Sequence, residues 1–133
     1  MLEKDADILA RFLGPARFGI FPVPGRGRHY LPWIHIADLC RIYLRALTDE
    51  EMKGPYNAVS PGHATLREFV NALSEASGKR GLKIPVPAII LKITLGNMAD
   101  MVLKGSRVSG EKIKNAGLIF QYPNLETALS GTI

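Results

Sequence analysis

The fold of this chain depends on the stretch Trp33-Ile34-His35-Ile36-Ala37-Asp38-Leu39-Cys40, where the hydrophobic pattern changes its period. Residues 29–36 are rich in aromatic and aliphatic side chains, which is typical of a short strand, and Pro32 makes it an edge strand or an interrupted one. From residue 37 apolar residues recur at helical spacing: Leu39, Ile42, Tyr43, Ala46 and Leu47. Asp38 falls in the first turn, where a carboxylate favours the helix dipole. The stretch predicts a strand that leads into a helix over 37–48.

Signals outside this stretch predict more helices and short strands. The surest is Thr65-Leu66-Arg67-Glu68, a capping box that opens a helix ending at Gly78. Other predicted helices cover 3–18, 88–95, 98–104, 109–115 and a last segment capped by Asn124. Short strands or extended segments are predicted at 56–59, 106–108 and 118–120, and an irregular loop at 22–27. We assign the fold class α/β. The expected arrangement is α+β-like, with helices around a small sheet of short strands.

Composition indicates one globular domain over residues 1–133. The chain has 14.6 kDa, 47% hydrophobic and 22% charged residues, which disfavours disorder. Its net charge of +5 is spread without a dense basic block, so the basic segments 26–28 and 79–83 are predicted to be solvated loops and no nucleic-acid partner is expected. The apolar stretch 88–103 is too short and too polar to span a bilayer and predicts a buried helix. No membrane partner is expected.

Compartment and redox state follow from the N-terminal residues and from the single cysteine. Acidic residues rather than a basic region follow Met1, so nothing favours export, and we expect a cytoplasmic protein. Cys40 cannot close an intrachain disulfide. Its position near a helix start could lower the thiol pKa, but its apolar neighbours favour a packed thiol.

Most catalytic motifs are missing from the sequence. In the loop that begins Gly25-Arg26-Gly27, Tyr30 stands where a dinucleotide fingerprint needs its third glycine. No Walker loop or nucleophile elbow occurs. His29, His35 and His63 lack the spacing of a zincin helix, so only folding could join them in a metal site. We therefore assign no catalytic, cofactor-binding or metal-binding residue.

Three residues are candidates for a substrate cleft: Arg28, Trp33 and His35. Strand alternation puts Trp33 and His35 on one face, with Asp38 just beyond at the helix start. One interpretation is structural, with His35 bonded to backbone or to Asp38 above a core tryptophan. The other is a pocket at a strand end, where ligand sites of open α/β sheets gather. The loop around Arg28 is either a flexible turn or an anion-binding loop.

Several motifs together resemble a known family. Residues 25–29, 33–39 and 54–61 look like the C-terminal half of extended short-chain dehydrogenase/reductases. Pro85-Val86-Pro87, the segments 95–100 and 103–108, and the run from Ala116 to Leu129 resemble the C-terminal extension of the nucleoside-diphosphate-sugar epimerase family. The similarity covers about residues 5–130, and the last motif is distinctive.

The resemblance also indicates what this sequence lacks. Family members bind NAD(P) in an N-terminal Rossmann domain with a glycine-rich turn, and a Tyr followed four residues later by Lys transfers the proton. In this sequence the four tyrosines are followed at that offset by Ile34, Leu47, Ser60 and Glu126. We expect a single C-terminal substrate-binding domain, without the N-terminal NAD(P)-binding domain. It would bind no cofactor alone, while NAD or NADP is implied for the full-length parent.

The expected function is the substrate-binding lobe of an NAD(P)-dependent epimerase/dehydratase-like oxidoreductase, inactive by itself, with Arg28, Trp33 and His35 lining the cleft. Its partners would be its own Rossmann domain and a small-molecule substrate of unknown identity. Leu31 stands where sugar-nucleotide epimerases commonly have a phosphate-binding arginine, so another small molecule is equally admissible. The uncovered apolar surface at 88–103 would support a homodimer. The alternative is a free-standing protein-interaction module with no enzymatic role.

Overall fold

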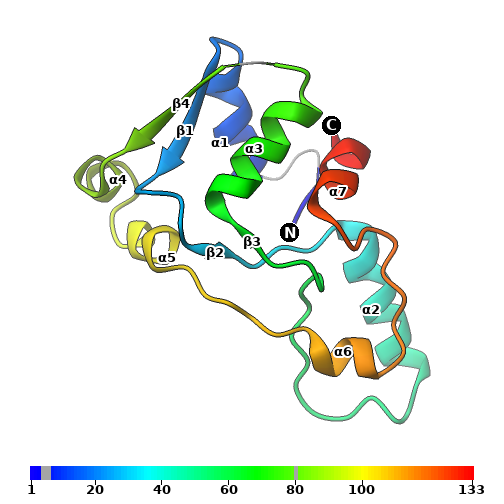
Figure 1. The fold of residues 1–133 in the computed structure, drawn as a ribbon. Coiled ribbons are helices and arrows are strands. Elements are labelled where there is room, and N and C mark those ends of the chain that lie inside the picture. Colours follow the sequence, from blue (N-terminus) through cyan, green and yellow to red (C-terminus); the bar gives the residue numbers. More distant parts are fainter. Residues whose placement is uncertain (4–6, 80) are drawn as a thin grey trace.

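The computed structural model describes residues 1–3, 7–79 and 81–133, and in these ranges helices surround two small sheets (Figure 1). The elements in chain order are α1 (Asp7–Ala16), β1 (Ile20–Pro24), β2 (Tyr30–Leu31), α2 (Ile36–Thr48), β3 (Ala64–Thr65), α3 (Leu66–Ala76), β4 (Leu82–Val86), α4 (Ala88–Leu95), α5 (Met98–Lys104), α6 (Glu111–Asn115) and α7 (Leu125–Thr132). The predicted fold class, helices around a small sheet of short strands, is confirmed.

The main strand pair joins segments that the sequence analysis assigned to loops. β1 pairs with β4 in parallel, with Ile20 opposite Leu82 and Pro24 opposite Val86. The prediction of an irregular loop at 22–27 is therefore wrong for residues 22–24. The prediction of a solvated loop at 79–83 is wrong for residues 82–83. Both strands contain proline, which cannot donate a ladder hydrogen bond. The prolines are tolerated because, among the described residues, each strand has a partner on one side only.

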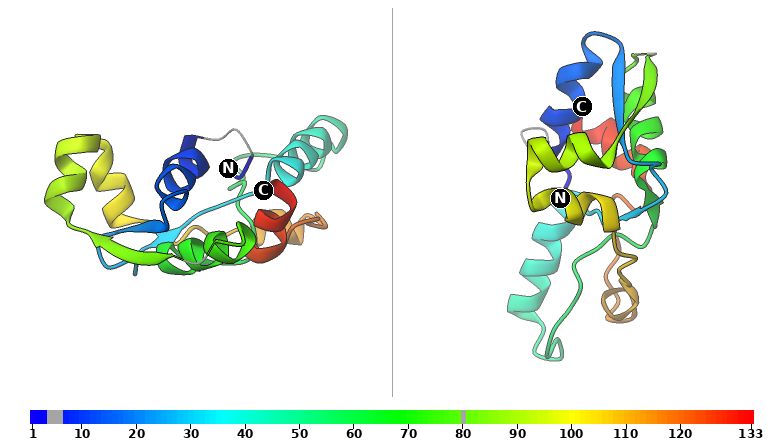
Figure 2. Two further views of the ribbon diagram at one scale, coloured as in Figure 1. Left: turned by 90° about the horizontal axis from the view of Figure 1, so that it is seen from above. Right: turned by 90° about the vertical axis from the view of Figure 1, so that its left-hand side faces the viewer.

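One main hydrophobic core lies around β1. Helices α1 and α3 both pack against this strand, and α7 packs against α3. Fully buried side chains fill the space between them, the largest being Phe21, Phe69, Leu9, Leu73 and Leu129. The rings of Phe12 and Phe69 meet edge to face at 5.5 Å. Figure 2 shows that α2 and the helical hairpin α4–α5 extend away from this body on opposite sides.

The capping box of α3 is confirmed in full. The Thr65 backbone N–H donates to Glu68 Oε2 at 2.6 Å, and the Glu68 N–H donates to Thr65 Oγ1 at 3.3 Å. The backbone bond from Thr65, with the bond from its hydroxyl, lowers the pKa of the Glu68 carboxyl. Gly78, just past the helix, has the positive φ of +64° that favours glycine at this position.

Several predicted elements differ from the structure. The predicted strand 29–36 is reduced to Tyr30–Leu31, because Pro32 interrupts it, and it pairs with β3. Residues 56–59 and 106–108 form no strand. Cys40 is exposed, so the prediction of a packed thiol is wrong. The opening helix is confirmed over Asp7–Ala16, while residues 4–6 of that prediction lie outside the described residues.

Two helices leave apolar side chains in solvent. On α2, which matches its predicted bounds to within one residue, Ile42 is buried, but Tyr43, Leu44 and Leu47 are 65%, 63% and 83% exposed. We call these three residues the outer face of α2. The prediction of a buried helix at 88–103 is wrong for its outer side, because Ile89 and Ile93 are 72% and 79% exposed. The core is too small to cover these side chains. Within the described residues, no helix has the length and hydropathy needed to cross a membrane.

Candidate functional site

The structure places His35 at the junction between the 33–35 segment and α2. It is the N-cap of α2, and its Nδ1 accepts a hydrogen bond from the Ala37 backbone N–H at 3.1 Å. Its ring stacks on Tyr122, with centroids 3.8 Å apart. Burial lowers the pKa of His35 below its ordinary value, against the opposing effect of the Asp38 carboxylate. The imidazole is therefore neutral at pH 7, with its proton on Nε2.

Asp38 connects α2 to the distant C-terminal segment. Its side chain is 1% exposed, and its two oxygens accept the backbone N–H groups of Gln121 at 2.7 Å and Tyr122 at 2.9 Å. Its predicted place in the first helical turn is confirmed. The carboxylate does more than complement the helix dipole, because it fixes the segment that carries Tyr122 beneath His35. Nothing in the sequence pairs residue 38 with residues 121–122.

Trp33 lies in the main core and is 3% exposed. Its indole Nε1 is buried and has no hydrogen-bond partner among the described residues. The loop at 60–62 packs close to the ring, since a Cβ placed on Gly62 would lie 3.6 Å from Trp33 Cζ2 and 2.8 Å from the Pro123 carbonyl oxygen. Ser60, also buried, donates its hydroxyl to that same carbonyl at 3.2 Å. The Trp33 ring thus packs beneath the place where residues 60–62 contact Pro123.

Arg28 lies on the surface, apart from this buried group. The loop that precedes it is a defined turn: Gly25 and Gly27 have φ of +59° and +66°, and the Gly27 carbonyl accepts the Arg67 backbone N–H at 3.0 Å. A Cβ on Gly27 would lie 2.7 Å from Val23 Cγ1, so this turn requires glycine. This hydrogen bond and the two glycine conformations define the turn, so the loop is not merely flexible. The placement of Arg28, Trp33 and His35 along a substrate cleft stays a prediction.

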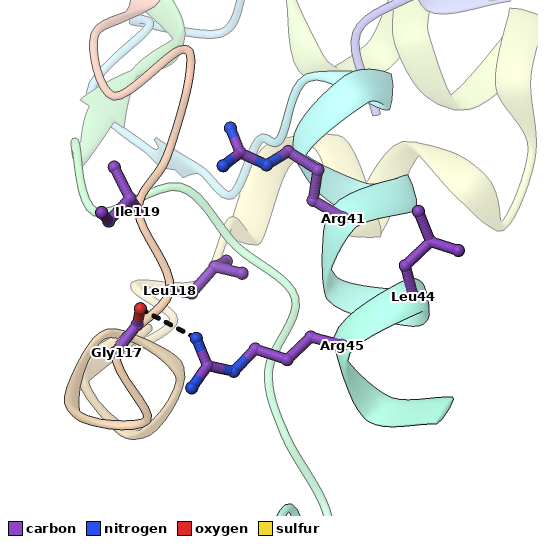
Figure 3. A pocket seen from close by; sticks show the side chains of 6 residues that line it. All are labelled: Arg41, Leu44, Arg45, Gly117, Leu118 and Ile119. Carbon is purple, nitrogen blue, oxygen red and sulfur yellow. Dashed lines mark hydrogen bonds between the residues drawn. The ribbon is translucent and has the colours of Figure 1, made fainter. Parts of the chain in front are cut away.

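Two pockets stand out in the described part of the chain, and neither is lined by those three residues. The first, which we call the α2 pocket, has a volume of about 370 Å³ and lies between α2 and residues 117–119 (Figure 3). In Figure 3, Arg41 and Arg45 extend from α2 toward that segment. Arg45 Nη1 donates to the Gly117 carbonyl at 2.9 Å, and its Nε lies 3.3 Å from Asp49 Oδ2. The bond to Gly117 holds α2 against the C-terminal segment, while the pair with Asp49 lies at the end of α2 itself. Leu44, Leu118 and Ile119 complete the lining.

The second pocket, which we call the α6 pocket, has a volume of about 440 Å³ and a polar lining. It is formed by Pro61, His63, Arg107, Ser109, Gly110, Glu111 and Lys114. Sequence reasoning missed this group, because 44 positions separate His63 from Arg107 and no local motif joins them. Among the described residues, no group of three or more His, Cys, Asp or Glu side chains is placed to hold a metal ion.

Known proteins match this chain over its whole length. A family model described as a domain of unknown function, DUF1731, matches residues 86–131. The mouse epimerase family protein SDR39U1 is 33% identical over 134 residues, which is 100% of this chain and 45% of that protein. The crystal structure of the human SDR39U1 protein with NADPH superposes with a TM-score of 0.91 at 32% identity, covering 98% of this chain and 44% of that one.

A more distant structure agrees in fold alone. The UDP-N-acetylglucosamine 4-epimerase of Bacillus cereus is 17% identical, with a TM-score of 0.72 over 99% of this chain and 41% of that one. The chain thus spans less than half the length of the proteins that it matches. The sequence and the fold agree: over its whole length, this chain is similar to the C-terminal part of the SDR39U1 epimerase family proteins.

Proposed function

We propose that this chain is the substrate-side lobe of an NAD(P)-dependent oxidoreductase and binds no nicotinamide cofactor by itself. The observation that carries the proposal is the likeness to the human SDR39U1 structure, which holds NADPH and is more than twice as long as the matched region. This sequence contains neither the three-glycine fingerprint nor a Tyr followed four residues later by Lys. Cofactor binding and proton transfer would therefore belong to the NAD(P)-binding domain of the parent.

The outer face of α2 supports an absent domain as the partner. Tyr43, Leu44 and Leu47 repeat on one side of a helix that buries only Ile42 and Asp38 on the other. Apolar faces of this kind are seldom left open on a soluble monomer. The relatives have further chain that could cover the face, since the match spans only 45% of the mouse protein. We therefore propose that the parent's Rossmann domain packs on α2. The matches give no support to a free-standing interaction module.

Calorimetry tests the proposal directly. NADPH and NADP are titrated into the 133-residue chain, with the human SDR39U1 protein as the positive control. We expect no saturable heat from this chain at micromolar concentrations. Saturable binding would contradict the proposal, because it would place the cofactor site within these residues.

The gene offers a second test. The reading frame upstream of codon 1 is expected to encode a glycine-rich turn after a strand, followed by a Tyr and Lys at the four-residue offset. A stop codon directly upstream of Met1, in the same frame, would argue instead for the free-standing module.

A further inference from the structure

One end of the β1–β4 pair exposes apolar side chains that the core does not bury. Phe18, which precedes β1, is 77% exposed, and Leu82, at the start of β4, is 75% exposed. Ile20 and Ile84 are exposed as well. Ile20 is the register partner of Leu82, and the Leu82 N–H donates to the Gly19 carbonyl at 2.9 Å, so the two segments meet at this end. We call Phe18, Ile20, Leu82 and Ile84 the apolar tip.

The turn that carries Phe18 is fixed by backbone contacts. The Phe18 N–H donates to the Pro15 carbonyl at 2.9 Å, and the Gly19 N–H donates to the Ala16 carbonyl at 3.0 Å. Gly19 has a φ of +72°, a conformation that glycine adopts readily. Gly81 has no space for a Cβ beside the Gly19 carbonyl, so β4 lies close against this turn. Phe18 is therefore held in solvent by a defined turn.

Three basic residues border the apolar tip. Arg17, Lys79 and Lys83 are exposed, and none of them takes part in an ion pair found among the described residues. Glu75 is the one carboxylate in the sequence of segments 14–20 and 74–86. This end of the molecule therefore combines exposed apolar side chains with an excess of positive charge.

The position of the tip leaves it open when the proposed domain packs on α2. Figure 1 shows the turn after α1 and the start of β4 at the top of the molecule, while α2 lies at the lower right. No residue of the tip lines either of the two pockets, so this surface does not enclose a small ligand. A second copy of the chain is disfavoured as the partner, because a two-fold contact between tips would bring the same cations together.

We propose that the apolar tip binds the surface of a membrane that contains anionic lipids. Exposed apolar side chains insert at the boundary between headgroups and acyl chains, and neighbouring lysine and arginine side chains attract anionic headgroups. The long basic side chains keep their charge at the level of the headgroups while their stems lie along apolar surface. The sequence predicts no membrane partner because the stretch 88–103 is too short to span a bilayer, but contact with a bilayer surface needs no spanning segment.

Co-sedimentation with lipid vesicles tests the proposal on the 133-residue chain. We expect binding to vesicles of phosphatidylcholine and phosphatidylglycerol in equal parts, weaker binding when salt is added, and much weaker binding to phosphatidylcholine alone. Phe18→Ser should weaken binding about tenfold or more, because it removes the aromatic side chain that inserts. Lys79→Ala should weaken it about fivefold, because it removes one charge that attracts the headgroups.

Two matched controls make the same kinds of change away from the tip. Leu47→Ser removes an apolar side chain that is 83% exposed on α2, and Lys114→Ala removes an exposed lysine charge from α6. Both variants should bind the vesicles as the unchanged chain does. All four substituted positions are exposed, so the variants are expected to fold, and circular dichroism checks that they do.

Phe18→Trp adds a fluorescent reporter at the tip, whereas Trp33 is buried. We expect its emission to shift to shorter wavelength on vesicle binding and to be quenched by a brominated lipid. Absence of binding to the anionic vesicles, or equal weakening by Leu47→Ser and Phe18→Ser, would overturn the proposal. Binding to polyglutamate as tight as to the vesicles, without an emission shift, would also overturn it and would indicate an acidic protein partner. None of these results depends on NADPH binding, so this inference and the proposed function fail separately.

Discussion

At the scale of single residues, Asp38 holds two distant parts of the chain together. Among the residues that the structure describes, it is the only fully buried one that carries a charge, and its two oxygens accept the backbone N–H groups of residues 121 and 122. A buried carboxylate is stabilising only when hydrogen bonds replace its water. Here two backbone donors do so, which explains how a charge can lie next to the core.

Replacing this carboxylate by an amide should destabilise the chain. In Asp38→Asn one oxygen becomes an NH₂ group that faces a backbone N–H, so one hydrogen bond is lost and a donor is left unsatisfied. We expect the free energy of unfolding to fall by about 1–3 kcal/mol. Urea denaturation measures it. Asp100→Asn is the matched control, since Asp100 is exposed and its ion pairs are long, at 3.9 and 3.6 Å. A similar loss in both variants would contradict this account.

His35 gives the chain a pH-dependent stability. Because burial lowers its pKa in the folded state, the unfolded chain binds its proton more readily. Stability from the neutral imidazole is therefore fully present above the unfolded pKa of about 6.5 and is lost as pH falls toward the folded value. The Tm should decrease between about pH 7 and pH 5.5, a range above the titration of Glu68, whose own pKa is lowered.

His35→Asn identifies the group responsible. Asparagine keeps an oxygen that can cap α2, but it does not titrate. We expect the variant to have a much flatter Tm profile over this pH range. A profile as steep as that of the unchanged chain would assign the effect to another histidine. The variant also tests the cleft prediction, because a purely structural His35 should affect stability alone.

At the scale of elements, the sequence predicted best where the signal is local. The capping box at Thr65–Glu68 and the helix stop at Gly78 each depend on residues within one turn, and each is found in the structure. β1 and β4 could not be predicted in the same way. Their prolines read as loop signals, and their pairing joins residues about 60 positions apart. The α6 pocket was missed for the same reason, since its cations meet only in the folded chain.

The β1–β4 pair begins where the backbones of Gly19 and Gly81 lie very close together. A Cβ placed on Gly81 would collide with the carbonyl group of Gly19, one residue before β1. We expect Gly81→Ala to cost about 1–3 kcal/mol, as overpacking usually does. Gly14→Ala is the control: Gly14 lies inside α1 just before Pro15, and apart from its chain neighbours nothing lies within 4 Å of the added Cβ, so its effect should be clearly smaller. Thermal denaturation compares the two, and equal effects would contradict the predicted collision.

At the scale of the whole molecule, two helices that extend from the core carry exposed apolar residues. The outer face of α2 extends to one side of the body, and α4, with Ile89 and Ile93 exposed, extends to the other (Figure 2). Both helices are fixed at their first end, because Asp38 of α2 accepts the Gln121 backbone N–H and α4 follows β4, which pairs with β1. The lobe is therefore a small stable body with two apolar extensions, a shape that suits one part of a larger protein.

The last prediction is that this chain associates with itself when nothing covers those extensions. Interdomain interfaces commonly bury about 600–1,500 Å², and a symmetric dimer is the simplest way to cover such a surface. Light scattering across a dilution series should give a mass that rises above 14.6 kDa with concentration. Leu47→Lys on α2 and Ile93→Lys on α4 both put a charge on an already exposed position, so neither should harm folding. The variant that restores the monomer identifies the associating helix, whereas a mass near 14.6 kDa for the unchanged chain at high micromolar concentration would show that neither extension drives association.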